Sequence, residues 1–134
     1  MDARITLLTA ALGLSLLVAS GCGSNRQLRS ITVTPATADA KNFLNSQVQF
    51  TAAGTYTDGS TSSSLSVRWS IDNPFFPPPL PTGITLSSSG LAACTGFVGA
   101  VTITATAPTD PTMPVTSMTP STANVTGSAQ LTCP

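Results

Sequence analysis

Two residue types are missing from this chain: its 134 residues include no histidine and no glutamate. Histidine is the commonest general base and a frequent metal ligand, so its absence excludes a Ser-His-Asp triad and removes much of the usual metal chemistry. Beyond the first segment the carboxylate side chains are few and scattered, namely Asp39, Asp58, Asp72 and Asp110. We therefore expect a protein that is not an enzyme and that holds neither a cofactor nor a metal.

Charge of either sign is also scarce. Charged residues make up 7% of the chain, and five basic and five acidic side chains give a net charge of zero. A nucleic-acid surface needs a basic stripe that can follow phosphates, and no such stripe is present, so nucleic acid is not an expected partner. Apolar residues still reach 41%, which is enough for one folded core. The abundant Ser, Thr, Gly and Pro are typical of β-rich extracytoplasmic modules.

Residues 1–21 are predicted to be a cleaved signal peptide. A short segment with Arg4 precedes an apolar run over residues 5–19, which is too short to span a membrane comfortably and is flanked like an export signal. The residues Ala19-Ser20-Gly21-Cys22 resemble the bacterial lipobox, whose cysteine receives diacylglycerol, becomes the new N-terminus and is then acylated, for example with palmitate. The alternative is an ordinary secretory leader that leaves Cys22 as a plain thiol.

The lipobox resemblance implies a membrane partner and an address. Two or three acyl chains on Cys22 would anchor the chain stably, with residues 22–27 as a polar tether. No Asp follows Cys22 directly, which favours the outer membrane in enteric bacteria. We expect a lipid anchor in the bacterial cell envelope, in the outer membrane, on its surface or its periplasmic face.

Residues 28–134 are predicted to form one all-β sandwich. The clearest strand is Gly99 to Ala107, in which Val101, Ile103, Ala105 and Ala107 face the core and the intervening threonines face outward. Further strands are expected over residues 28–34, 47–55, 65–71, 84–86 and 123–133, with residues 91–97 leading into the clearest strand. Pro35 should end the first strand because it has no N–H to donate to a ladder.

The first two connections and the single tryptophan have specific expectations. Phe43 or Leu44, within the connection 36–46, is expected to plug the core. Asp58-Gly59 is expected to be a tight turn rather than a calcium site, since one carboxylate is far short of the oxygens that calcium takes. Trp69 falls on the apolar face of its strand and should point into the core; stacking on a sugar ring would require the other face.

The proline-rich segment from Asp72 to Gly83 is predicted to be an extended, polyproline-like loop. Its apolar residues Phe75, Phe76 and Leu80 are the first candidates for contact with a partner. The alternative is that Phe75 and Phe76 plug the end of the sandwich. Residues 108–120 are predicted to be a second long surface loop.

The chain has three cysteines. If Cys22 carries lipid, Cys94 and Cys133 remain to form a disulfide, which an oxidising compartment permits. Such a bond would stabilise the fold by roughly 4 kcal/mol in the chain-entropy account. The alternative is a pair of free thiols in a reducing compartment.

Several segments, taken as an ordered set, resemble the bacterial immunoglobulin-like group 2 family. They cover most of residues 28–133 and lie at residues 30–35, 49–52, 54–60, 67–70, 89–91 and 99–105. The resemblance implies an immunoglobulin-like Greek-key sandwich of about seven strands. It also implies a stalk or adhesion module without catalytic residues.

The expected function is binding or adhesion to an unknown protein or glycan through loops at the ends of the sandwich, chiefly residues 72–83 and 108–120. The alternative is a structural accessory subunit that faces the periplasm and docks on an envelope complex. It would dock through a sheet edge or through the loop that contains Phe75 and Phe76.

Overall fold

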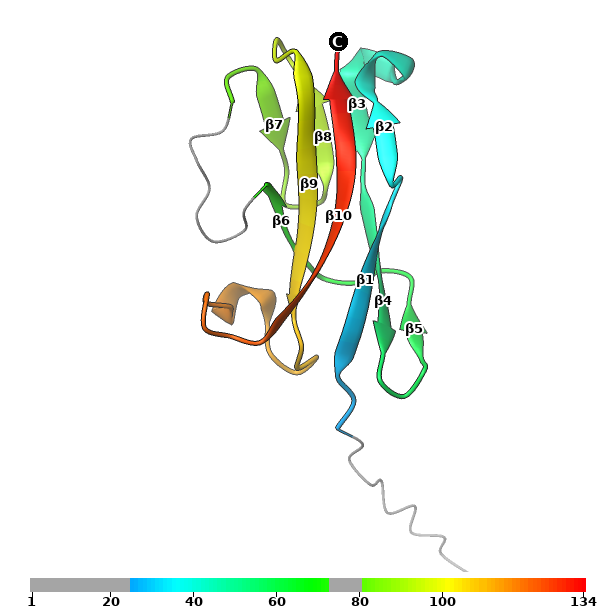
Figure 1. The fold of residues 1–134 in the computed structure, drawn as a ribbon, viewed down its shortest axis with the longest axis vertical. Coiled ribbons are helices and arrows are strands. Elements are labelled where there is room, and N and C mark those ends of the chain that lie inside the picture. Colours follow the sequence, from blue (N-terminus) through cyan, green and yellow to red (C-terminus); the bar gives the residue numbers. More distant parts are fainter. Residues whose placement is uncertain (1–24, 73–80) are drawn as a thin grey trace, which may run out of the picture.

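Strands in two layers pack against each other in the computed structural model, which describes residues 25–72 and 81–134 (Figure 1). The strands are β1 (Leu28–Thr34), β2 (Thr37–Asp39), β3 (Gln47–Gln49), β4 (Thr51–Tyr56), β5 (Thr61–Ser62), β6 (Arg68–Ile71), β7 (Ile84–Leu86), β8 (Leu91–Cys94), β9 (Gly99–Pro108) and β10 (Asn124–Cys133). Three short 3-10 turns are η1 (Ala40–Asn42), η2 (Leu44–Ser46) and η3 (Val115–Ser117). The predicted all-β sandwich is confirmed.

The order of the strands is that of an immunoglobulin-type sandwich. One layer contains two hydrogen-bonded groups of strands, β1-β4-β5 and β3-β8-β7. These groups are continuous because only Phe50 separates β3 from β4. The other layer has the strand order β2-β10-β9-β6. The first strand changes layer at Pro35: β1 pairs antiparallel with β4, and β2 pairs parallel with β10. If β1–β2 and β3–β4 each count as one interrupted strand, seven strands and the short β5 make up the described sandwich.

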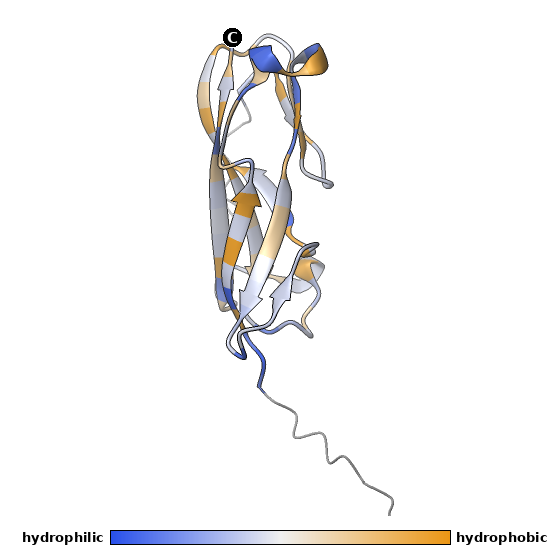
Figure 2. Ribbon diagram, turned by 90° about the vertical axis from the view of Figure 1, so that its right-hand side faces the viewer, coloured by the Kyte–Doolittle hydropathy of each residue, from blue (hydrophilic) through white to orange (hydrophobic). Residues whose placement is uncertain are grey.

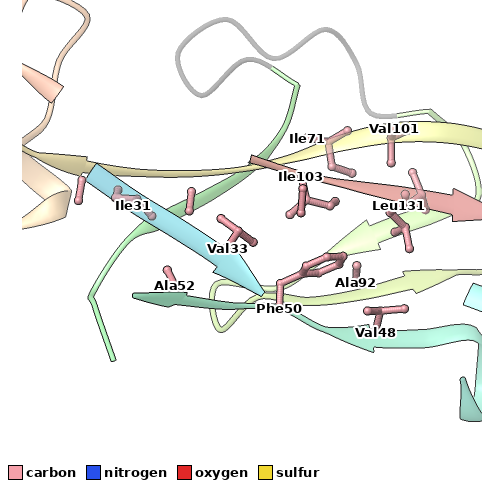
Figure 3. Packing of buried hydrophobic residues seen from close by; sticks show 14 of the residues in the cluster. Ile31, Val33, Val48, Phe50, Ala52, Ile71, Ala92, Val101, Ile103 and Leu131 are labelled. Carbon is pink, nitrogen blue, oxygen red and sulfur yellow. The ribbon is translucent and has the colours of Figure 1, made fainter. Parts of the chain in front are cut away.

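The core lies between the layers and follows the period of two that the sequence predicts (Figure 3). Val48, Phe50, Ile103 and Leu131 are completely inaccessible to solvent. They come from β3, the β3–β4 junction, β9 and β10, so both layers contribute to the same apolar centre. Trp69 is half-buried and packs against this core, as expected.

The outer face of β9 differs from the prediction. Thr104 and Thr106, expected to face solvent, are buried. Residues 108–120 were predicted to be a long surface loop, but Pro108 ends β9 and the residues after it fold back beside the strand: η3 contacts β9, Met118 is buried, and Arg68 donates from Nη2 to the Val115 carbonyl at 3.1 Å.

Two further boundaries differ from the sequence expectations. The strand predicted from Leu65 begins only at Arg68, because the chain crosses there from one layer to the other and the Leu65 N–H donates to the Ala52 carbonyl at 3.0 Å. The connection 36–46 contains the extra strand β2.

The chain enters and leaves the sandwich at opposite ends (Figure 1). The N-terminal end is where β1 begins and where β4, β5 and β9 meet their loops; the C-terminal end is where β10 finishes beside η1 and η2. The coil at the C-terminal end combines strongly hydrophilic and strongly hydrophobic residues, whereas the first described residues are hydrophilic (Figure 2). These two ends carry the features discussed below.

Candidate functional site

Several residues predicted from the sequence to act in function lie outside the described residues. These are the proposed lipid attachment residue Cys22 and the loop residues Phe75, Phe76 and Leu80. The described neighbours of that loop are held in place: the Thr102 N–H donates to Asp72 Oδ1 at 3.3 Å, and the Thr104 hydroxyl donates to the Asp72 carbonyl at 3.0 Å.

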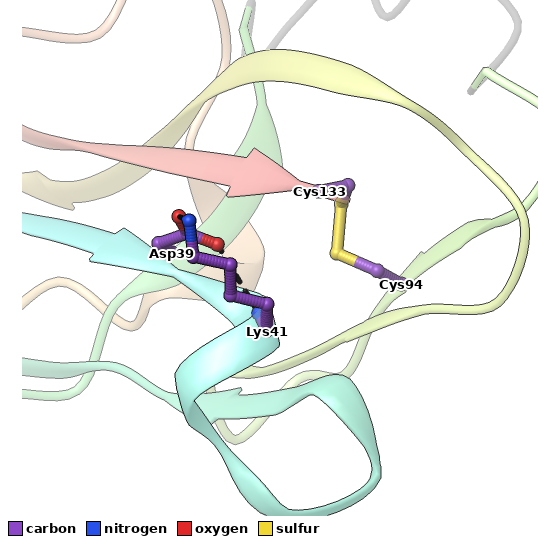
Figure 4. Close-up of a disulfide and its surroundings, with 4 residues drawn as sticks. All are labelled: Asp39, Lys41, Cys94 and Cys133. Atoms are coloured by element: carbon purple, nitrogen blue, oxygen red, sulfur yellow. Dashed lines mark hydrogen bonds and ion pairs between the residues drawn. A yellow bond between two sulfur atoms is a disulfide. The ribbon is translucent and has the colours of Figure 1, made fainter.

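The predicted disulfide between Cys94 and Cys133 is present (Figure 4). It joins β8 in one layer to β10 in the other, with a Cα–Cα distance of 5.7 Å. Cys133 is buried at the end of β10. The bond therefore links the two layers covalently at the C-terminal end of the sandwich.

The residues 40–46, which we call the finger, rest on the two strands that this disulfide joins. Within the finger, η1 contacts β10 and η2 contacts β8. At its base the Asp39 side chain accepts from the Lys41 N–H, and the Lys41 ammonium lies 2.9 Å from Asp39 Oδ2 (Figure 4). The hydrogen bonds from Lys41 and its ammonium charge lower the pKa of Asp39, which keeps this carboxylate ionised.

The finger carries the main correction to the sequence interpretation. Neither Phe43 nor Leu44 plugs the core: Phe43 is 41% exposed and Leu44 is 86% exposed, and the buried residue is Ala40. Asn45 and Ser46 follow with φ of 57° and 52°, a left-handed conformation that is unfavourable for residues other than glycine. The sharp turn directs the two apolar side chains away from the core.

A third large apolar side chain is exposed at the same end. Val98, in the turn between β8 and β9, is 74% exposed. Together with Phe43 and Leu44 it completes the set of exposed large hydrophobic residues in the described part of the chain. All three belong to turns at the C-terminal end (Figure 1).

The N-terminal end contains a groove of about 400 Å³ instead of a protrusion. Its lining combines buried residues of the strands with residues of two loops, and apolar and hydroxyl side chains both contribute: Leu28, Tyr56, Ala107, Leu65, Met113 and Val115 with Ser62, Ser64, Ser66 and Thr112. A smaller polar hollow, lined in part by Arg26 and Asp110, adjoins it and shares Thr112 with it. The groove therefore presents polar and apolar surface in similar measure, and the charged side chains belong to the adjoining hollow.

The first described residues are fixed to this end. The Arg26 guanidinium lies over the Tyr56 ring at 3.6 Å from its centroid and 3.9 Å from Asp58 Oδ2. Gln27 exchanges two bonds with Thr57: the Gln27 N–H donates to the Thr57 hydroxyl at 3.1 Å, and the Thr57 N–H donates to the Gln27 carbonyl at 2.9 Å. The predicted tether is thus bound to the sandwich from Arg26 onward.

The carboxylates of Asp58 and Asp110 accept hydrogen bonds from residues close to them in sequence. Asp58 Oδ1 accepts from the hydroxyl and the N–H of Ser60, and Asp110 Oδ1 accepts from both groups of Thr112. These bonds lower the pKa of both aspartates. The Asp58-Gly59 turn is confirmed, with Gly59 at φ 81°. Within residues 25–72 and 81–134, no three His, Cys, Asp or Glu side chains come together to hold a metal ion.

No family model matches the chain, and no curated protein matches its sequence. The family resemblance therefore stays a prediction. In the part of the chain that the structure describes, none of the helices is long and apolar enough to cross a membrane.

Sequence reasoning did not identify the finger or the groove. The signal for the finger was available in Asn42-Phe43-Leu44-Asn45, two apolar residues between two asparagines, since asparagine tolerates left-handed turns. The groove had no such signal because its lining comes from segments far apart in the sequence.

Proposed function

We propose that this chain is a non-catalytic binding module of the bacterial cell envelope, anchored through lipid on Cys22, which binds a protein partner through the C-terminal end of its sandwich. The observation that carries the proposal is the exposure of Phe43, Leu44 and Val98 in turns at that end. Phe43 and Leu44 are neighbours in the finger, and large apolar side chains exposed together are typical of a contact site.

The shape of the molecule supports this proposal. The chain enters at the end opposite to the finger, and Arg26 and Gln27 bind to the sandwich. A lipid on Cys22 would therefore lie about four residues, or roughly 14 Å of extended chain, from the first fixed residue. Such an anchor holds the N-terminal end near the membrane and leaves the finger accessible.

The binding proposal can be tested by photo-crosslinking in cells that export the full chain. A photoreactive residue replaces Leu44 in one variant and the exposed Thr32 on β1 in a matched control. We expect crosslinked products from position 44 and at least ten-fold less from position 32. Equal yields at the two positions, or no product at either, would contradict a contact surface at the finger.

The anchor requires a separate test. Cells that express the chain are labelled with palmitate, and the Cys22→Ser variant is the control. We expect label in the wild-type chain and none in the variant, together with release of the variant from the membrane fraction. Unlabelled wild-type chain would leave an ordinary secreted module. Protease treatment of intact cells then distinguishes the surface from the periplasmic face.

A further inference from the structure

The segment between β9 and β10, residues 110–122, folds back beside β9, and we call it the strap (Figure 1). Most of its residues are exposed, but Met118 is buried. Its turn η3 contacts β9, and Thr106 on the outer face of β9 is completely inaccessible to solvent. The strap therefore covers part of a sheet face on which the alternation of the strand places polar side chains.

The strap has few bonds to the sandwich. Three of its residues, Pro111, Pro114 and Pro120, have no N–H to donate. Within residues 25–72 and 81–134, the hydrogen bond from the sandwich to residues 110–118 is that of Arg68 Nη2 to the Val115 carbonyl, at 3.1 Å. The other bonds of the strap close turns within it or join its last turn to Asn124 at the start of β10. It can therefore leave the sheet with the loss of few contacts.

The same sheet contains buried polar atoms without partners. In the described part of the chain, Ser70 Oγ, Thr106 Oγ1 and Asn124 Oδ1 are inaccessible to water and form no hydrogen bond. They come from β6, β9 and β10, one from each strand. A polar group that has lost its bonds to water and gained none destabilises the state in which it is buried. For Thr106, that state is the one in which the strap is closed.

We propose that the strap opens in the folded chain while the sandwich stays intact, and that the unpartnered hydroxyl of Thr106 favours the open form. Segments with few buried contacts open at a much lower free energy than the whole fold does. Thr104, the neighbouring outward residue of β9, has no such preference, because its hydroxyl donates to the Asp72 carbonyl at 3.0 Å.

Opening of the strap would change the groove at the N-terminal end. Strap residues Pro111, Met113 and Val115 contribute to the lining of the groove, together with residues of the loop that contains Leu65. When the strap leaves the sheet, its part of the lining is removed and the groove becomes wider. The strap thus acts as a gate for this groove. The inference goes beyond the proposed function and does not depend on the finger, which lies at the opposite end.

Oxidation of a native methionine measures the opening without an added label. Met118 is 5% exposed, and oxidation by dilute hydrogen peroxide requires access to its sulfur. The exported full chain is treated at several urea concentrations below its unfolding transition, and the sulfoxide at Met118 is quantified by mass spectrometry. Half-buried Met113 serves as the internal reference. We expect a rate at Met118 that is almost independent of urea, because a local opening exposes little new surface. A rate that rises with urea in parallel with global unfolding would overturn the inference.

The substitutions Thr106→Val and Thr104→Val form a matched pair for the second measurement. Valine removes the hydroxyl and nearly keeps the shape of the side chain. Thr106→Val should slow oxidation of Met118 about five-fold or more, because the closed form no longer buries an unpartnered hydroxyl. Thr104→Val should not slow it, because that hydroxyl has a partner. Urea unfolding checks that both variants fold. No slowing in Thr106→Val, or equal slowing in both variants, would overturn the inference.

Discussion

The two ends of the sandwich are closed by different means. At the C-terminal end, one covalent bond between Cys94 and Cys133 joins the layers. At the N-terminal end, noncovalent contacts serve instead: the Leu28 N–H donates to the Thr109 carbonyl at 2.8 Å, and the Arg26 guanidinium lies over Tyr56. The loop beside the disulfide protrudes with Leu44 exposed, whereas the loops at the N-terminal end line a groove.

The largest expected effect comes from removal of the covalent closure. The double variant Cys94→Ala with Cys133→Ala should lower the free energy of unfolding by about 4 kcal/mol, because the bond closes a loop with a sequence separation of 39. Urea unfolding measures the loss. Hydrogen exchange should rise first in the ends of β8 and β10. An equal rise at the N-terminal end would show that the two ends are not closed independently.

Removal of the packed closure should have the next largest effect. Leu28 is 3% exposed at the start of β1, so Leu28→Ala should cost about 3 kcal/mol through lost burial and a cavity. Leu44→Ala is the matched control, because it makes the same truncation at a position that is 86% exposed. We expect the control to change the unfolding free energy by less than about 0.5 kcal/mol. Similar losses in both variants would mean that Leu44 contributes to the fold.

The two ends also differ in how much space surrounds a glycine with a left-handed backbone. Gly83 and Gly59 both have left-handed φ, of 88° and 81°. A Cβ on Gly83 would lie 2.4 Å from the Phe97 nitrogen, whereas a Cβ on Gly59 would meet nothing within 4 Å. Gly59→Ala should therefore cost about 1 kcal/mol for its backbone conformation, and Gly83→Ala about 1–3 kcal/mol more, in the same urea assay. Equal costs would contradict the close approach at Gly83.

The smallest effect is a difference in acid sensitivity. The pKa values of Asp39, Asp58 and Asp110 are all lowered in the folded chain, so the stability that they contribute is present above the unfolded pKa of about 3.9 and is lost as the pH falls through the lower folded values. Two of the three lie at the N-terminal end. The double variant Asp58→Asn with Asp110→Asn should flatten the dependence of the urea midpoint on pH between pH 5 and 2 more than Asp39→Asn does.

Salt should affect the acid sensitivity due to Asp39 differently from that due to Asp110. The Lys41 side chain is the main cause of the lowered pKa of Asp39, whereas neutral groups of Thr112 lower that of Asp110. Ionic strength screens the charged pair more than the hydroxyl and N–H bonds. Acid sensitivity due to Asp39 should therefore decrease in 1 M salt, and that due to Asp110 should persist. A uniform response to salt would contradict these assignments.

Most strands were predictable because they have a local signal, whereas the short β2 and β5 were not predicted. Val101 to Ala107 alternates in apolar and polar residues, and that period of two gives both the strand and the face that lies in the core. The disulfide was also predictable, from the number of cysteines and the predicted export signal. Neither inference required knowledge of contacts between distant segments.

The finger and the groove depend on interactions that the alternation of apolar and polar residues does not indicate. Hydrophobicity alone placed Phe43 or Leu44 in the core, but the bonds of Asp39 and the left-handed residues Asn45 and Ser46 turn the chain outward. Thr106 is buried because the loop that follows β9 folds back beside that strand. Local hydrogen bonds and the course of the loops, rather than composition, decide the exposure of these residues.

The change of layer by the first strand also determines how the molecule would respond to a pull. Force applied between residue 25 and Pro134 acts at opposite ends of the sandwich, and β2 runs parallel to β10. Such a force slides the two strands along each other, so their hydrogen bonds bear the load together instead of opening one at a time. The bond from Cys133 to Cys94 passes part of that load into β8 in the other layer. The fold therefore resists extension between residue 25 and Pro134.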